Sequence, residues 1–514
     1  MRTYRAVFAL VLACLIVCAA PGAAAAQQEG VASYASAPKL TPPLLTVNRS
    51  SRGQAPGLIF AAVFQNKFFQ GVPLVGQGGP MIIDSKGHYV WLKPASKTAP
   101  DTLNLQVQRY QGKPVLTYWD GTVTNTGEML GTWHVLNDRY KEIAKIAPVT
   151  DGWQPSAHEF LITKSGTALT TGYKYVPHRD LTAVGGGSDQ TLLDSGLVEF
   201  DVKTGKLVRA WSADEHIPMT DSYMPANPNN PNAYDPWHIN SIDVDKDGNW
   251  LVSMRNTWAI YKINPTTGAI IWTLGGKHSS FAVPDNVAFA FQHDARWQPN
   301  GDLSIFDNDC CAFVPQPSGP PKTAPPVHGA QSRGMEIKLD ENAKTVSLVT
   351  ENKLYDLISG TQGNRQLLAN GNVMLGWGQQ PFFSEFSKAG KLLLSVRFPD
   401  PDESYRVYRY SWKGNPGARP AAAARPSGSG TRVYASWNGA TELAAWRIWA
   451  GPTSRKLKVV AKRVARGGFE TAKKIRSAGP IVKVQALNGK GRVIGTSRAV
   501  RRQNTSGTEP APTY

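Results

Sequence analysis

Cysteine and long apolar runs are both scarce in this sequence of 514 residues. It has four cysteines, and two of them, Cys14 and Cys18, lie in an N-terminal apolar stretch. The other two, Cys310 and Cys311, are adjacent, which excludes a framework of disulfides. This pair could form a strained vicinal disulfide, two free thiols or an intermolecular bond. Beyond residue 26 no stretch approaches the ~20 apolar residues that span a bilayer, so no transmembrane segment is expected.

The N-terminus has the features of a processing segment. Two arginines precede an apolar run over residues 6–18, and a series of small residues ends at Ala26. This order predicts a signal peptide over residues 1–26 and a secreted or extracytoplasmic protein, in the periplasm or the cell envelope. A lipoprotein signal at Cys14 is the alternative, although the apolar run before that cysteine is short.

The net charge of +18 is distributed unevenly. Residues 431–503 carry seventeen Lys and Arg against two Glu, whereas the body before them is near neutral. The overall basicity therefore gives no argument for nucleic acid as a partner. The basic C-terminal part either holds the protein at an anionic envelope polymer or is a solvated basic face.

Helical periodicity is scarce in residues 57–413, where short apolar runs alternate with turns. Two kinds of hairpin recur there, one with a glycine turn such as Lys164-Ser165-Gly166, and one that ends in Trp or Leu, such as residues 198–211. Two hairpins in each repeat of ~50–80 residues favour the four-stranded blades of an all-β propeller over a stack of sandwiches. Strong and weak copies together indicate about five to seven blades.

Composition divides the rest of the chain. Residues 27–56 are rich in Ser, Ala and Pro and are expected to form an extended N-terminal segment before the propeller of residues 57–413. Residues 414–430 are rich in Pro, Gly, Ser and Ala, which is typical of a flexible linker. Short alternating runs in residues 431–503 predict a small fibronectin-III- or immunoglobulin-like β-sandwich, and residues 504–514 a disordered tail.

Three histidines share one position in the first kind of hairpin. His158 and His293 each precede a turn glycine by eight residues, and His238 precedes one by ten. The innermost strand of each propeller blade lines the central channel, so we expect the three imidazoles to converge at one end of it. Asp294 could orient an imidazole, but neighbouring side chains of a strand point to opposite faces, so its partner is expected to be another residue.

Arg255 lies one strand after His238, where an arginine is costly unless it is paired or reaches an anion. Asn240 and Asn308 could donate hydrogen bonds to an oxyanion or serve as turn residues. Because no His-x-His or His-x₃-His pair with a carboxylate occurs at ligand spacing, we favour an anion site over zinc and expect no metal. The sequence has neither a Gly-x-Ser-x-Gly elbow nor a P-loop, so serine hydrolases and nucleotide-dependent enzymes lack support and no cofactor is expected.

Motifs in a fixed order resemble the arylsulfotransferase (ASST) family. They are Ala157-His158-Glu159-Phe160, Asp235-Pro236-Trp237-His238-Ile239-Asn240, Ser253-x-Arg255-Asn256, Trp272-Thr273-Leu274-Gly275-Gly276, and Gln292-His293-Asp294-Ala295-Arg296 followed by Phe306-Asp307-Asn308. Ser332-Arg333-Gly334 and Gly376-Trp377-Gly378 resemble the last two blades of that family. The resemblance spans residues 65–412, excludes the basic C-terminal part, and is to a divergent secreted branch, since Phe291-Gln292-His293-Asp294 replaces the small Gly-Gln-His context of better-known bacterial members.

The resemblance implies a six-bladed propeller that moves a sulfuryl group from a phenolic sulfate ester to a phenolic acceptor without nucleotide sulfate. It implies that His293 is transiently sulfated, with ping-pong kinetics, and that His158, His238 and Arg255 hold the group. The expected substrate-binding residues are Asn240, Asn308, Arg333 and Trp377. The residue types suit this chemistry, because a neutral imidazole, with an ordinary pKa of ~6.5, can attack the sulfur of an aryl sulfate.

Two other functions fit the same residues. One is a non-catalytic propeller that binds phenolic or sulfated ligands. The other is an aryl sulfate hydrolase that uses water as the acceptor in the same channel.

Overall fold

The computed structural model describes residues 30–65, 72–124, 128–147, 152–309, 313–314, 322–323, 331–476 and 478–503. The expected signal peptide, the Cys310–Cys311 pair and the expected tail lie outside these ranges. Within them the chain forms strands and two short 3₁₀ helices, Thr182–Val184 and Met219–Asp221, which confirms the all-β expectation. None of the helices in the described ranges is long and apolar enough to cross a membrane.

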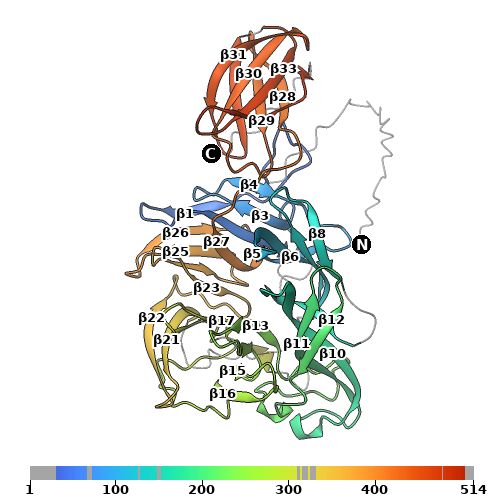
Figure 1. Cartoon of the computed structure of the whole chain (residues 1–514), viewed down its shortest axis with the longest axis vertical. Coiled ribbons are helices and arrows are strands. Elements are labelled where there is room, and N and C mark those ends of the chain that lie inside the picture. The colour runs from blue at the N-terminus through green and yellow to red at the C-terminus, as the bar shows by residue number, and fades with distance from the viewer. Residues whose placement is uncertain are drawn as a thin grey trace, which may run out of the picture.

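Antiparallel sheets of four or five strands account for most of residues 46–410 (Figure 1). The first three have the orders β27-β2-β3-β4 (Asp402–Tyr410, Leu58–Gln65, Gly79–Ile83, Tyr89–Leu92), β5-β6-β7-β8 (Asp101–Tyr110, Lys113–Val123, Met129–Leu136, Glu142–Ile146) and β12-β11-β10-β9 (Leu207–Ser212, Gln190–Asp201, Thr167–Arg179, Gln154–Ile162). The next three have the orders β13-β14-β15-β16 (Ile239–Val244, Trp250–Met254, Ala259–Ile263, Ile270–Gly275), β17-β18-β21-β22 (His293–Trp297, Leu303–Asp307, Arg333–Asp340, Thr345–Asn352) and β1-β26-β25-β24-β23 (Thr46–Ser50, Leu392–Arg397, Phe382–Phe386, Val373–Gly376, Asn364–Leu367).

One edge strand of each sheet contacts its counterparts in the two neighbouring sheets. These contacts run in a closed series, β27–β5–β9–β13–β17–β23 and back to β27. The series closes because β27, late in the chain, pairs with β2 and so completes the sheet that β2 to β4 begin. We call this arrangement the six-sheet ring, and its six contacting edge strands the inner strands.

Hydrophobic clusters fill the spaces between adjacent sheets. One cluster joins Leu169 and Leu197 of the sheet β9–β12 to Val252 and Tyr261 of the next sheet. Every residue of β14 is buried, as expected of a strand with a sheet packed on each of its faces. Burial on both faces explains why such strands appear in the sequence as short apolar runs rather than as strict alternations.

The N-terminal segment is part of the packed structure. Its residues 46–50 form β1, which adds to the outer edge of β26. Tyr34 is buried, and its ring centroid lies 4.4 Å from that of Phe469 in the C-terminal domain. The segment therefore contacts both parts of the molecule.

Two further sheets form the C-terminal domain around a separate hydrophobic cluster. They are β28-β29-β32 (Ala421–Ser427, Gly430–Ser436, Glu470–Arg476) and β31-β30-β33-β34 (Lys456–Ala465, Ala445–Thr453, Ile481–Leu487, Val493–Thr496), with β35 (Val500–Arg501) also on β33. The expectation of a linker through residue 430 was wrong for its second half, because β28 pairs with β29 residue by residue from Ala421 to Ser427. Ala424 is buried in the cluster, so the small residues serve close packing there.

The C-terminal domain is fixed to the outer strand β4 by hydrogen bonds. The Asn438 side chain accepts from the backbone N–H of Leu92 at 3.0 Å and donates to its carbonyl at 2.8 Å. The backbone N–H of Gly439 donates to the Val90 carbonyl at 2.8 Å. Glu470 accepts from the backbone N–H of Ala35 at 3.1 Å. Paired contacts of this kind hold the two parts in one orientation (Figure 1).

Candidate functional site

The three predicted histidines lie together at the inner strands. His158 is on β9, His293 begins β17, and His238 directly precedes β13. The ring centroids of His158 and His238 are 4.8 Å apart with the planes at 83°. Tyr405 of β27 lies beside two of these histidines. Its ring centroid is 5.7 Å from that of His158 and 6.3 Å from that of His293.

His293 is buried, and both of its ring nitrogens have partners. Nδ1 lies 2.8 Å from Asn308 Oδ1 and 3.0 Å from the Phe291 carbonyl, two acceptors that require a proton on Nδ1. Nε2 therefore carries the lone pair, and it accepts the backbone N–H of Gln362 at 3.2 Å. Burial and then the charge of Arg255 lower the pKa of His293 well below its ordinary value. The imidazole is neutral at neutral pH, with its Nε2 lone pair as the nucleophilic position.

His238 is held by a carboxylate that sequence reasoning did not single out. Its Nδ1 lies 2.6 Å from Asp235 Oδ2, and its backbone N–H donates to Asp235 Oδ1 at 2.9 Å. The residue has a φ of 54°, in the left-handed region, which the two bonds to Asp235 help to hold. The sequence contained a signal for this pairing, because Asp235 stands three residues before His238 in the same motif.

His158 is the third imidazole of the cluster and is buried. Its Nδ1 lies 2.6 Å from the Ser156 hydroxyl. Burial lowers its pKa well below the ordinary value, and electrostatic repulsion of a proton by the neighbouring imidazoles and by Arg406 and Arg255 lowers it further.

Arg255 supplies a cation beside the histidines. Its guanidinium donates to Asn256 Oδ1 at 2.9 Å and to the Gly360 carbonyl at 3.2 Å, and lies 4.6 Å from the ring centroid of Phe291. Burial lowers its pKa to about 10, so it stays charged at neutral pH. None of the ion pairs found in the described part of the chain includes Arg255, so its charge is available to an anion.

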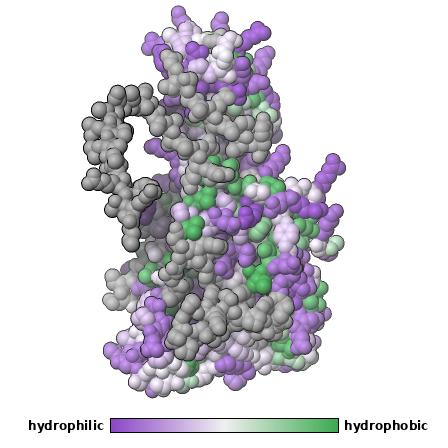
Figure 2. Space-filling model, turned by 180° about the vertical axis from the view of Figure 1, so that it is seen from behind, coloured by the Kyte–Doolittle hydropathy of each residue, from purple (hydrophilic) through white to green (hydrophobic). Residues whose placement is uncertain are grey.

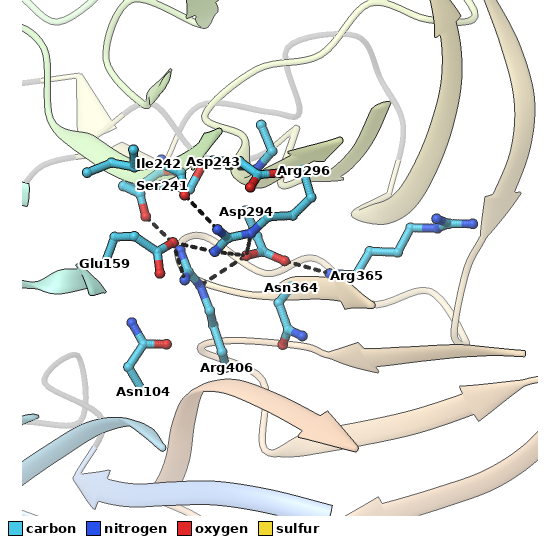
Figure 3. A network of polar contacts seen from close by, with 12 residues as sticks. Asn104, Glu159, Ser241, Ile242, Asp243, Asp294, Arg296, Asn364, Arg365 and Arg406 are labelled. Atoms are coloured by element: carbon cyan, nitrogen blue, oxygen red, sulfur yellow. Dashed lines mark hydrogen bonds and ion pairs between the residues drawn. The ribbon is translucent and has the colours of Figure 1, made fainter. Parts of the chain in front are cut away.

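The acidic neighbours of two of these histidines point into a central ion network, which consists of Glu159, Asp294, Arg296 and Arg406 (Figure 3). Arg406 donates to Glu159 Oε2 at 3.0 Å and to the Asn240 carbonyl at 2.6 Å. Arg296 donates to Asp294 Oδ1 at 2.9 Å and also to Glu159. The network joins β9, β17 and β27, three of the inner strands.

The charges of this network compensate one another within the ring. Burial alone would raise the pKa of Glu159, but the Arg296 and Arg406 guanidiniums hold it below its ordinary value. Two carboxylates thus face two guanidiniums. The expectation that Asp294 pairs with a residue other than its neighbouring histidine agrees with these contacts.

The four residues expected to bind substrate all make hydrogen bonds, ion pairs or core contacts within the protein. Asn308 holds His293 and donates to the carbonyls of Ser359 and Gln362 at 2.9 and 3.0 Å. Asn240 donates to the Gln292 carbonyl at 2.7 Å and so links β13 to β17. Asn104 and Asn364 make the same kind of bond from β5 to β9 and from β23 to β27.

Arg333 and Trp377 are not brought to the histidines by any contact in the described chain. The Arg333 guanidinium pairs with Asp307 and Glu351, each at 3.0 Å. Trp377 is fully buried and packs edge-on against Phe306. In the described chain the Arg333 guanidinium is therefore engaged in ion pairs and the Trp377 indole in core packing, and their contact with substrate stays a prediction.

The described residues offer no set of side chains suited to bind a metal ion. Among the described residues there is no group of three or more His, Cys, Asp or Glu side chains that could hold a metal ion. The site is instead a cluster of imidazoles beside a cation, which suits an anionic ligand.

The fold and this site define an all-β protein with a buried histidine and arginine cluster. The model of the arylsulfotransferase (ASST) family matches residues 106–399, a range that contains all three histidines and Arg255. The chain belongs to this family. No curated protein matches the chain.

Solved structures with some likeness have low sequence identity. A protein of unknown function from Bacteroides caccae has 14% identity and a TM-score of 0.39, covering 69% of this chain and 98% of its own. A luciferin-regenerating enzyme has 12% identity and a TM-score of 0.34, covering 64% and 84%. A β-propeller domain from Myceliophteria thermophila has 10% identity and a TM-score of 0.34, covering 74% and 95%.

Proposed function

We propose that this chain is an exported aryl sulfotransferase that works through a sulfated His293. The observation that carries the proposal is the fixed tautomer of a buried neutral imidazole, His293, beside the charged Arg255. Family membership supports the reaction class. Export is supported by the signal-peptide pattern of residues 1–26.

In the first half-reaction, the His293 Nε2 lone pair forms a bond to the sulfur of an aryl sulfate. The ester S–O bond breaks, its electron pair stays on the phenolic oxygen, and the phenolate then takes up a proton. The Gln362 N–H, which now donates to Nε2, becomes free to donate to a sulfuryl oxygen. Arg255 stabilises the charge that spreads over the sulfuryl oxygens, by analogy with phosphoryl transfer.

In the second half-reaction, an acceptor phenol loses its proton and its oxygen forms the new S–O bond. The N–S bond breaks and its electron pair returns to Nε2. The Asp235–His238 pair is suited to take the phenol proton, because Asp235 fixes His238 Nδ1 as the donor nitrogen and leaves Nε2 as a proton acceptor.

We assign the finer architecture in the same proposal. The six-sheet ring is a six-bladed β-propeller, and the C-terminal domain is an immunoglobulin- or fibronectin-III-like β-sandwich. The closed contacts of the inner strands and the two-sheet core of the C-terminal domain support these assignments. The basic C-terminal domain holds the protein at an anionic envelope polymer, which its excess of Lys and Arg supports.

The test is to incubate the purified protein with 4-nitrophenyl sulfate and a phenol. We expect the sulfated phenol as product and, without acceptor, a sulfuryl adduct on the peptide that contains His293. His293→Ala should abolish both, whereas His278→Ala, at a side chain that is 76% exposed, should abolish neither. Free sulfate without phenol sulfation would support the hydrolase alternative. Ligand binding with no turnover and no adduct would refute the enzyme.

A further inference from the structure

The outer face of the sheet β31-β30-β33-β34 carries a second group of functional side chains. Along β30 the side chains of Trp446, Ile448 and Ala450 are buried in the domain core. The alternating Arg447 and Trp449 therefore point to the opposite face, where both are half-buried. On β33, Lys483 and Gln485 lie directly across from Trp449 and Arg447.

These side chains form an ordered cluster, which we call the Trp449 face. The Trp449 indole N–H donates to Gln485 Oε1 at 3.0 Å, and Arg447 donates to the same oxygen at 3.5 Å. The Lys483 ammonium lies 5.4 Å from the Trp449 ring centroid. Val459, 38% exposed, pairs across from Trp449 on the other side. The row Val459, Trp449, Lys483 spans about 10 Å, two strand spacings.

The charged side chains around the Trp449 face are basic. Lys462 and Arg463 of β31 are exposed beside the row that contains Arg447. Residues 421–503 contain two acidic residues, Glu442 and Glu470. Glu470 is bonded to Ser36 at the contact with the six-sheet ring. Glu442 follows Thr441, whose backbone bonds to Gly414. Hydrophilic residues predominate over this domain when the molecule is seen from behind (Figure 2).

A separate cleft in this domain lies between β28 of the other sheet and β35, with Ala421, Ala422 and Val500 in its lining. It has a volume of about 440 Å³ and is lined by Arg419 and Arg498 among others. Arg498 lies in the short stretch between β34 and β35, both of which pair with β33. No ion pair found in the described chain uses either arginine.

We propose that the Trp449 face is a binding site for an acidic polysaccharide, a polymer of sugar rings with carboxylate or sulfate groups. The apolar face of a sugar ring packs on the indole and Val459, while Arg447 and Lys483 pair with the acidic groups on either side. Single-stranded nucleic acid is disfavoured, because successive bases stack on several aromatic side chains and the described strands of this face offer one. The proposal rests on the proposed anchoring of the C-terminal domain at an anionic polymer, to which it gives a site and a polymer class, and it does not depend on sulfuryl transfer.

The experiment measures binding of the full-length protein to four polymers: polygalacturonate, dextran sulfate, neutral dextran and duplex DNA. We expect binding to polygalacturonate, to dextran sulfate or to both, which identifies the acidic group, and none to dextran. Trp449→Ala should weaken this binding about tenfold, as truncation of a central aromatic anchor does, and Trp449→Tyr should restore most of it. Far-UV circular dichroism and the thermal midpoint report whether each variant is folded.

The matched control compares two lysines of one domain. Lys483→Ala removes a charge from the Trp449 face, and Lys474→Ala removes one from the exposed part of β32 in the other sheet. We expect a loss of several-fold for Lys483→Ala and less than twofold for Lys474→Ala. Equal losses in both lysine variants, unchanged binding in Trp449→Ala, DNA binding as tight as polysaccharide binding, or no polymer bound would each overturn the proposal.

Discussion

Replacing Glu159 by Gln tests whether the central ion network holds the catalytic geometry. Glu159 is buried, with 2% of its side chain exposed, and accepts from both Arg296 and Arg406. The change keeps the shape and removes one negative charge. The network then has two guanidiniums against one carboxylate, Asp294, and one of them, Arg406, is fully buried.

The expected cost follows from that uncompensated charge. Breaking a buried ion pair by removing one partner destabilises a protein by about 3–5 kcal/mol. With a urea m-value of about 3 kcal/mol/M, the unfolding midpoint of Glu159→Gln should fall by about 1 M or more. The sulfuryl-transfer rate should fall as well, because His158 is the neighbour of Glu159 on β9 and the strand loses two cross-ring bonds.

The assay is urea unfolding followed by tryptophan fluorescence, with the transfer rate measured on the same samples. Asp189→Asn is the control, since this carboxylate pairs with His178 at the surface with 72% of its side chain exposed. Exposed pairs contribute little, so its midpoint should stay close to that of the unaltered protein. A shift in Glu159→Gln no larger than the one in this control would refute the reasoning.

Three further predictions concern the charge and the protonation of named groups. Arg255→Met should lower the transfer rate about 10²–10³-fold with little change in unfolding midpoint, as loss of a preorganised donor does, and an unchanged rate would exclude Arg255 from the site. Because burial lowers the pKa of His293 well below its ordinary value, the rate at which the sulfuryl adduct forms on His293, a step that does not use His238 as a base, should stay level from pH 8 to below about 6.5 and fall only under more acidic conditions. A fall in this first half-reaction centred near pH 6.5 would contradict the prediction. Burial alone would lower the pKa of His134, but its bonds to Asp120 and Glu142 raise it, so this group stabilises the fold below about pH 6.5 and the contribution disappears as pH rises through the raised pKa. His134→Gln should therefore lower the thermal midpoint at pH 5.5 more than at pH 9, and an equal loss at both values would count against the charged state.

The convergence of the three histidines could be predicted from the sequence because strand repeats fix a phase. A residue at one offset from the turn of each repeat is placed at one height by the geometry of the repeat itself. His158 and His293 share an offset of eight residues from the turn glycine, and His238, at ten, differs from them by two residues and so keeps the same face of the strand. The partner of His238 could also have been predicted from the sequence, because Asp235 is only three residues away. The partner of His293 Nε2 could not be predicted in this way, because Gln362 lies in the loop before β23 and donates through its backbone, which no side-chain motif records.

Two sequence signals did not predict the local structure: the composition of the expected linker, and the motifs that contain Trp377 and Arg333. Residues 421–430, which are rich in Ala, Ser and Gly, form paired strands, because small side chains also suit a strand that packs closely on a partner. Trp377 and Arg333 sit in recognisable motifs, yet their side chains serve core packing and ion pairing. A motif identifies a residue type at a position, whereas its role depends on which face of the strand it occupies and what the next sheet presents there.

Adjacent residues on two inner strands serve two purposes, on β9 within the strand and on β17 at an irregularity where Asp294 has a φ of 55°. His158 is followed by Glu159 on β9, and His293 is followed by Asp294 on β17. The histidines face the cluster beside Arg255, and the acids face the central ion network. The acids neutralise Arg296 and Arg406, so the charge of these arginines does little to attract a sulfate away from the site, while Arg255 keeps its charge for the substrate. A substitution of either acid should therefore act on the histidine next to it through the strand, and a substitution of Arg255 should act on the anion directly. These two effects can be separated, because the first lowers stability and rate together and the second lowers the rate alone.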